Sequence, residues 1–270
     1  DFHEQGINEP YYFPPAAEPY HEVITNWQRE FQQEIGKNHA GYFDKAGWLY
    51  FSKEIFDLLY PSYGDTYPTY SGSIGMTYEQ GGSGRAGLAV ITQVGDTLRL
   101  SDRVAHHVTT GLSTVETSAR NAQKLVAEYQ KFRKQKDFKY DSYVIKGSNN
   151  QIAPLLSLLS KNNIDWQMVS TSTQALPAKG FHFKTGAQEA FKLEIGDILV
   201  STQQEKGTLV SVLFEPRTKL SDSLTYDITA WSMPYAYGLD AYAVEGQLKA
   251  TPFAATGERK TDFLATEGFM

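Results

Sequence analysis

Apolar side chains recur at helical spacing in several stretches of the first half of the chain. The pattern over residues 20–35 predicts an amphipathic helix that Gly36 ends, and a short helix is predicted over residues 52–59. A long helix is predicted from the N-cap pair at 101–102 to the basic run 131–136. Its apolar face is traced by Val104, Val108, Leu112, Val115, Ala119, Ala122, Val126 and Tyr129.

Strand patterns occupy the region between these helices. Residues 74–79 alternate well enough to predict a strand, which the glycine-rich run 81–84 ends. A hairpin is predicted from residues 88–92 and 97–100, joined by a turn. The preceding stretch, residues 60–70, contains four tyrosines and favours an irregular loop, either at the surface or projecting aromatic side chains into a cleft.

The pattern changes after residues 137–140. A strand over 142–146, a helix over 152–160 and a strand over 166–170 together predict a βαβ unit, and a further strand over 198–201 and helix over 207–214 follow. We therefore predict an α/β protein with two domains, residues 1–136 and residues 137–270.

Composition narrows the possible chemistry. The net charge is -6 and the pI is near 5.6, so no broad basic surface is available and nucleic acid is not an expected partner. No apolar run approaches the roughly 20 residues of a membrane span. Cysteine is absent from the sequence, so any metal site must use histidine and carboxylate ligands. An aromatic content of 13% favours a cleft that binds peptide or sugar.

Two segments carry candidate chemistry. His3 stands at an expected strand end in the string Asp-Phe-His-Glu-Gln-Gly, which is compatible with a site residue or with a structural histidine. Glu79 ends the strand Thr-Tyr-Glu just before Gly81 and Gly82, where a carboxylate could act as a general base or remain a paired or solvated side chain. The chain contains no HExxH or HxxE motif, so no short motif forms a zinc site by itself.

Together these segments resemble the funnelin-type zinc carboxypeptidases. The opening histidine, the aromatic and proline-rich loop after it, the tyrosine-rich loop and the Thr-Tyr-Glu strand carry the resemblance, which covers about residues 1–136. The separation of 76 residues from His3 to Glu79 is close to that between the family's last zinc ligand and its catalytic glutamate. The fold implied is part of a mixed-sheet carboxypeptidase-like α/β/α domain followed by a smaller accessory α/β domain.

The resemblance implies a role for each matching residue. His3 is expected to bind zinc, and Glu79 to deprotonate the zinc-bound water and pass the proton to the leaving amine. Tyr63 and Tyr67 lie in the loop where the family has a tyrosine that closes over substrate, and nothing in the sequence selects one of them or excludes a purely structural role. Arg85 could meet a substrate carboxylate or form a structural ion pair.

The family's other two zinc ligands and its carboxylate-binding residues lie in an upstream half of the catalytic domain. The expected partners are therefore that N-terminal half and a peptide substrate, and the natural protein is expected to begin before Asp1. By itself this chain should bind zinc poorly and hydrolyse nothing. A cell-wall peptide amidase, or a peptide- or glycan-binding module without catalysis, are the alternative functions. Members of this family that carry an extra domain are usually exported from bacteria. The resemblance therefore predicts a periplasmic or extracellular location.

Overall fold

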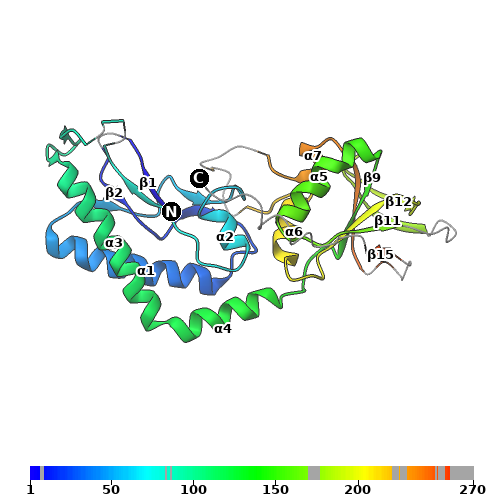
Figure 1. Ribbon diagram of the computed structural model, residues 1–270, viewed down its shortest axis with the longest axis horizontal. Helices are drawn as coiled ribbons and strands as arrows, with labels where there is room; N and C mark the ends of the chain where they lie inside the picture. Colours follow the sequence, from blue (N-terminus) through cyan, green and yellow to red (C-terminus); the bar gives the residue numbers. More distant parts are fainter. Residues whose placement is uncertain are drawn as a thin grey trace, which may run out of the picture. The chain divides into compact units, whose positions relative to one another are not determined.

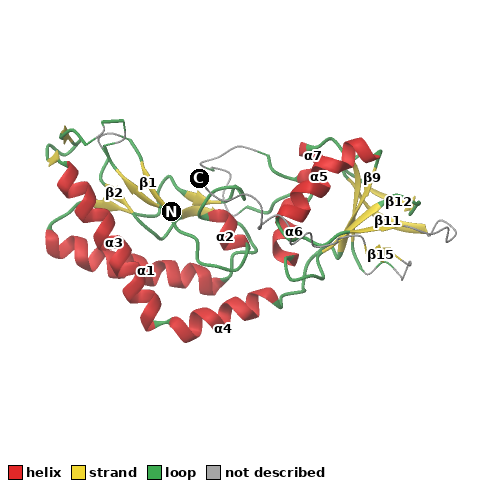
Figure 2. Cartoon of the chain, viewed as in Figure 1, coloured by secondary structure: helices red, strands yellow, loops and turns green. Residues whose placement is uncertain are grey.

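The computed structural model describes residues 1–6, 9–82, 84–85, 87–169, 177–220, 225, 230–246, 248 and 253–255. The chain divides into two compact units, Asp1–Arg133 with Lys219–Thr229, and Lys134–Thr218 with Ala230–Met270. The division after Arg133 lies near the predicted boundary after residue 136, but the second unit is interrupted by a segment that belongs with the first. Both units contain helices and strands (Figures 1 and 2), so the chain is an α/β protein in the general sense.

A four-stranded mixed sheet organises the first unit. Its strands are β1 (Phe2–Glu4), β6 (Tyr78–Gln80), β2 (Tyr11–Tyr12) and β4 (Tyr50–Phe51), in that order across the sheet. The pairs β1–β6 and β2–β4 are parallel, whereas β2 and β6 are antiparallel. Because β1 lies at one edge, the strand that carries His3 is paired on one side only among the described residues.

Helix α1 (Asn26–Ala46) packs on one face of this sheet. Thr25 caps its N-terminus through a capping box with Gln28, so the helix begins later than the pattern predicted. It also continues through Gly36, which does not end it. A Cβ atom at Gly36 would lie 2.2 Å from the Pro14 carbonyl oxygen, so glycine is needed here for close approach of the loop that contains Pro14.

The long predicted helix is present as two helices, α3 (Leu100–Arg120) and α4 (Ala122–Arg133), with a break at Asn121. The N-cap residue is Arg99, whose backbone amide donates to Asp102 Oδ2, so the cap lies two residues before the expected one at 101. The apolar face predicted for α3 is largely exposed, with 53–67% of Val104, Val108, Leu112 and Val115 accessible to solvent.

The face of α3 that packs against the sheet and α1 is polar. Each buried side chain has a specific partner: His106 Nδ1 bonds Gln80, Thr110 bonds Tyr11, and Ser113 bonds His39 Nδ1. Hydrogen bonds therefore compensate for burial of the polar face, which amphipathic periodicity alone does not predict. The buried residues of this face are Arg103, His106, Thr110, Ser113 and Thr117.

The segment between α1 and β6 differs from the expectation at residues 52–59 and in the loop 60–70, and only the last two residues of the predicted strand 74–79 belong to β6. Residues 52–59 are not helical: β5 (Asp57–Leu58) pairs in parallel with β3 (Ala17–Tyr20), and Lys53 and Ile55 have positive φ values. The loop that follows contains the short helix α2 (Thr66–Tyr70). The predicted hairpin is present as β7 (Val90–Ile91) and β8 (Thr97–Leu98).

The second unit is a seven-stranded sheet in which every described neighbouring pair is antiparallel. Strands β9 (Ser142–Lys146) and β10 (Gln167–Val169) lie on either side of β13 (Ile198–Ser201), so the predicted βαβ unit exists as a split unit whose two parallel strands do not pair. Helix α5 connects β9 to β10, and β13 and α6 match their predicted ranges. The elements are β9 (Ser142–Lys146), α5 (Asn149–Lys161), β10 (Gln167–Val169), β11 (Pro177–His182), β12 (Gln188–Lys192), β13 (Ile198–Ser201), α6 (Gly207–Phe214), α7 (Met233–Ala236), β14 (Asp240–Val244) and β15 (Phe253–Ala255).

Two apolar clusters form the cores. In the first unit, the rings of Tyr11, Phe13, Phe43 and Tyr78 pack together between the sheet and the helices. In the second, the core is formed by Val144, Val169, Phe191, Leu193, Leu199, Tyr242 and Val244. Among the described residues, no helix has both the length and the apolar character needed to cross a bilayer.

Candidate functional site

His3 and Glu79 are neighbours because their strands are parallel and in register. His3 on β1 is the Cα partner of Glu79 on β6, and side chains alternate between the two faces of the sheet. The rings of Phe2 and Tyr78, one residue earlier on each strand, contact each other on the face covered by α1 and α3. His3 and Glu79 therefore lie on the opposite face, where His3 Nδ1 is 3.5 Å from Glu79 Oε2.

A cavity of about 520 Å³ lies over this pair, and we call it the His3–Glu79 cavity. Its walls come from the ends of β1 and β6, from β5 and from the tyrosine-rich loop. The polar side chains that line it are Asp1, His3, Glu4, Gln5, Glu9, Asp57, Tyr63, Asp65, Thr77 and Glu79. The cavity is thus acidic, with a single imidazole beside its carboxylates.

Burial controls the electrostatics of Glu79. Its side chain is 7% exposed, whereas that of His3 is 67% exposed, so the carboxylate is the desolvated member of the pair. Desolvation raises the pKa of Glu79, and the nearby His3 opposes this without cancelling it. Glu79 Oε2 is buried and has no hydrogen-bond partner among the described residues. Glu79 is therefore less solvated than an ordinary surface carboxylate and is a stronger proton acceptor.

A second buried carboxylate, Asp65, lines the same cavity. Burial raises its pKa, while hydrogen bonds within its own loop, including one from the Thr66 hydroxyl, act in the opposite direction. Asp57, which also lines the cavity, is 6% exposed. Sequence reasoning did not single out either aspartate, because both belong to irregular or very short elements positioned by distant parts of the chain.

The residues of the cavity fit part of a zinc site. His3 presents an exposed imidazole beside a carboxylate oxygen that has no hydrogen-bond partner, which suits a ligand next to a general base. Within the described part of the chain, however, no group of three or more histidine, aspartate or glutamate side chains is arranged to hold a metal ion.

The other predicted site residues separate into two groups. Tyr63 lines the His3–Glu79 cavity. Tyr67 lies in α2 and Arg85 is an exposed residue of the loop after β6, and neither is among the residues that line this cavity. The structure therefore brings Tyr63 together with His3 and Glu79, and it leaves Tyr67 and Arg85 outside the cavity.

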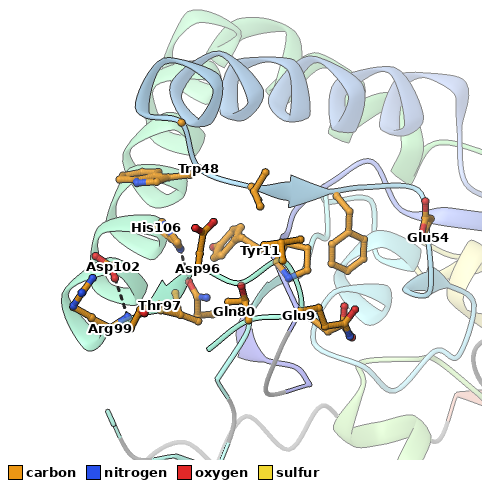
Figure 3. Close-up of a pocket in the computed structure, with 18 of the residues that line it drawn as sticks. Glu9, Tyr11, Trp48, Glu54, Gln80, Asp96, Thr97, Arg99, Asp102 and His106 are labelled. Carbon is orange, nitrogen blue, oxygen red and sulfur yellow. Dashed lines mark hydrogen bonds between the residues drawn. The ribbon is translucent and has the colours of Figure 1, made fainter. Parts of the chain in front are cut away.

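A second cavity, of about 640 Å³, lies near the far edge of the sheet and is shown in Figure 3; we call it the Trp48 cavity. The Trp48 ring contacts the His106 ring edge-on, with 4.6 Å between centroids. Glu9 and Ile55 line both cavities. Sequence analysis did not identify this cavity, because its residues come from five separate segments with no shared motif.

The adjacent histidines of α3 have structural contacts. His107 Nδ1 is hydrogen-bonded to the Tyr11 hydroxyl, and His106 Nδ1 to Gln80. Both rings also contact the Tyr11 ring edge-on, with centroid distances of 5.6 Å for His106 and 5.4 Å for His107. No protein-family model matches this chain, and no curated protein or solved structure matches it significantly.

Proposed function

We propose that this chain carries part of the active site of a zinc-dependent, carboxypeptidase-type hydrolase that cleaves peptide bonds near a C-terminus. The observation that supports the proposal most directly is the in-register placement of His3 and Glu79 on adjacent parallel strands, 3.5 Å apart at the wall of a cavity. The finer fold assignment, part of a carboxypeptidase-like domain followed by an accessory domain, belongs to the same proposal.

In this proposal each residue has a distinct task. His3 holds the metal, and Glu79 takes a proton from the attacking water and passes it to the leaving amine. Zinc, when bound, supplies polarisation of the scissile carbonyl and a lower pKa for its water. The raised pKa of Glu79 suits both transfers, because a more basic carboxylate accepts the proton more readily and its acid form still donates it.

Tyr63 is the better of the two candidate tyrosines for contact with substrate, because it lines the cavity and Tyr67 does not. Arg85 remains a candidate only if its loop approaches the cavity on substrate binding. The metal ligands beyond His3 are assigned to an upstream half of the catalytic domain. Periplasmic or extracellular location stays a prediction of the same resemblance.

The first test is the reading frame before Asp1. The proposal expects an HxxE motif there, followed by arginine-containing sequence that binds a substrate carboxylate. An open start codon immediately before Asp1, with no such motif, would favour the non-catalytic binding module instead.

The second test is biochemical and uses the longest natural polypeptide that contains this sequence. We expect about one zinc per chain by atomic absorption, as for a single three-ligand catalytic site, and cleavage of peptides with a free C-terminus but not of amidated ones. Glu79→Gln should lower turnover by about 10²–10⁴-fold while zinc content is retained. Glu30→Gln, an exposed substitution on α1, is the matched control. Full activity of Glu79→Gln would refute the assignment of the base, and cleavage of amidated peptides alone would favour the amidase alternative.

A further inference from the structure

The walls of the Trp48 cavity combine apolar surface with negative charge. The apolar and aromatic side chains that line the cavity are those of Tyr11, Trp48, Leu49, Phe51, Ile55, Val94 and Leu98. Four carboxylates also line it, Glu9, Glu54, Asp96 and Asp102, against one guanidinium, Arg99. In Figure 3, Asp96, Asp102 and Arg99 lie on the same side of the view as Trp48, whereas Glu54 lies at the opposite end.

Two of the four carboxylates already have partners. Glu9 accepts a hydrogen bond from Gln93 Nε2, and Asp102 accepts one from the Arg99 backbone amide. Glu54 and Asp96 are exposed and pair with no cationic side chain of the part of the chain that the structure describes. The cavity therefore retains uncompensated negative charge next to an aromatic ring, an arrangement that attracts organic cations.

His106 adds an independent hydrogen-bonding requirement. Its ring lies between Trp48 and Gln80 on the cavity wall (Figure 3), and the residue is 7% exposed. Gln80 Nε2 donates to the Gly81 carbonyl, so Gln80 Oε1 is the atom that accepts from His106 Nδ1.

Burial lowers the pKa of His106 to about 4, so the ring is neutral at pH 7. A neutral ring that donates through Nδ1 presents Nε2 as an acceptor. That Nε2 is buried and has no hydrogen-bond partner among the described residues. Among the described residues of this wall, Thr92 Oγ1 is also buried without a partner. His106 Nε2 requires a donor, which matches the cation that the carboxylates attract.

We propose that the Trp48 cavity binds an organic cation with an apolar stem, the chemistry of an arginine or lysine side chain. The stem packs on Trp48, a cationic N–H group faces Asp96, and a further donor satisfies His106 Nε2. Since Glu9 and Ile55 also line the His3–Glu79 cavity, a long peptide held there could place a basic side chain in the Trp48 cavity. Only this last assignment, to a peptide substrate, rests on the proposed function.

The test measures binding to the 270-residue chain by isothermal titration calorimetry at low salt. The probe is N-acetyl-arginine amide, compared with N-acetyl-lysine amide and with N-acetyl-citrulline amide, which has nearly the shape of arginine without its charge. We expect saturable binding of the arginine probe with a dissociation constant on the order of 1 mM. The citrulline probe should bind roughly tenfold more weakly.

Two variants locate the site. Trp48→Ala should weaken arginine binding at least about fivefold, and Asp96→Asn about threefold. Both positions are at least partly exposed, so circular dichroism should show a folded chain, and Glu30→Gln is the charge-matched control away from the cavity. Equal affinity for arginine and citrulline, or no saturable binding of either, would overturn the proposal.

Arginine binding that survives Trp48→Ala would also overturn it, because the cation would then bind elsewhere, for example in the acidic His3–Glu79 cavity. The probes are amidated and contain no scissile bond near a free C-terminus, so their binding is independent of hydrolysis. Failure of the peptidase test and failure of this inference can therefore be told apart.

Discussion

Replacement of Glu79 by glutamine should have opposite effects on catalysis and on stability. Glutamine keeps the size of the side chain but cannot act as a base, so turnover of the longest natural polypeptide should fall by about 10²–10⁴-fold. The structure predicts that folding of the chain is not weakened by the same change, because the native carboxylate is buried at an energetic cost.

The size of the stability effect follows from the environment of the pair. Attraction between His3 and Glu79 is weak, about 0–1 kcal/mol, because the histidine side chain is 67% exposed to solvent. Desolvation of the buried carboxylate is the larger effect and raises its pKa. At pH 7 the variant should therefore equal or exceed the native chain in stability, by up to about 1 kcal/mol, or about 2–4 °C in melting temperature.

The direction in which folding stability changes with pH follows from the raised pKa of Glu79. A carboxyl group whose pKa is raised in the folded state stabilises that state below its unfolded pKa, and this contribution is lost as pH rises through the folded pKa. The stability advantage of Glu79→Gln should thus appear as pH increases from about 4 to 7. Differential scanning fluorimetry of both proteins across this range measures it. A variant that melts clearly lower than the native chain at pH 7 would refute the claim that desolvation dominates.

Three further predictions concern the first unit. Phe43→Ala removes a side chain that is 0% exposed and should cost about 3–5 kcal/mol of unfolding free energy by urea titration. Gly81→Ala places a Cβ 2.2 Å from the Glu9 carbonyl oxygen and should cost about 1–3 kcal/mol, whereas Gly41→Ala, with nothing within 4 Å, should stabilise by about 0.5–1 kcal/mol. Burial lowers the pKa of His39 to about 4, so the neutral ring is the buried form. Lowering the pH from 7 to 5 should therefore reduce the unfolding free energy of the native chain, relative to that of His39→Gln, by about 2 kcal/mol. An unchanged difference between the two proteins would contradict neutral burial of His39.

Local sequence patterns predicted correctly those helices and strands whose formation depends mainly on neighbouring residues. The β7–β8 hairpin, β13 and α6 occur where alternation, turn residues or a continuous apolar run indicated them. The segment 52–59 was predicted wrongly as a helix, because its pairing with β3 involves residues about forty positions earlier and is not visible locally.

Helix α3 shows a different failure of sequence reasoning. The apolar side chains, including Val108 and Leu112, do lie along one face, but that face is exposed in this chain. The buried face is selected by specific hydrogen bonds of His106, Thr110 and Ser113 with residues of β6, β2 and α1. The spacing of apolar residues predicts on which face of a helix they lie. It does not predict which face is buried, because burial of a polar face depends on hydrogen-bond partners elsewhere in the chain.

The candidate site could be predicted only in part for a related reason. The resemblance paired His3 with Glu79, and the tyrosine-rich loop suggested Tyr63, which does line the cavity. Asp57 and Asp65 could not be selected, because their burial depends on how β5 and the loop before α2 fold over the sheet. The Trp48 cavity depends on five segments at once, so no single sequence window contains its signal.

The chemistry proposed for the His3–Glu79 cavity depends finally on sheet register, more than on attraction between the two side chains. The parallel pairing places Phe2 opposite Tyr78 and His3 opposite Glu79, so the aromatic pair and the imidazole–carboxylate pair take opposite faces. A slip of one residue would move Glu79 into the aromatic core and expose Tyr78, and both changes are unfavourable. Because attraction between the exposed imidazole and the buried carboxylate contributes little, core packing of Tyr78 holds the base beside its histidine.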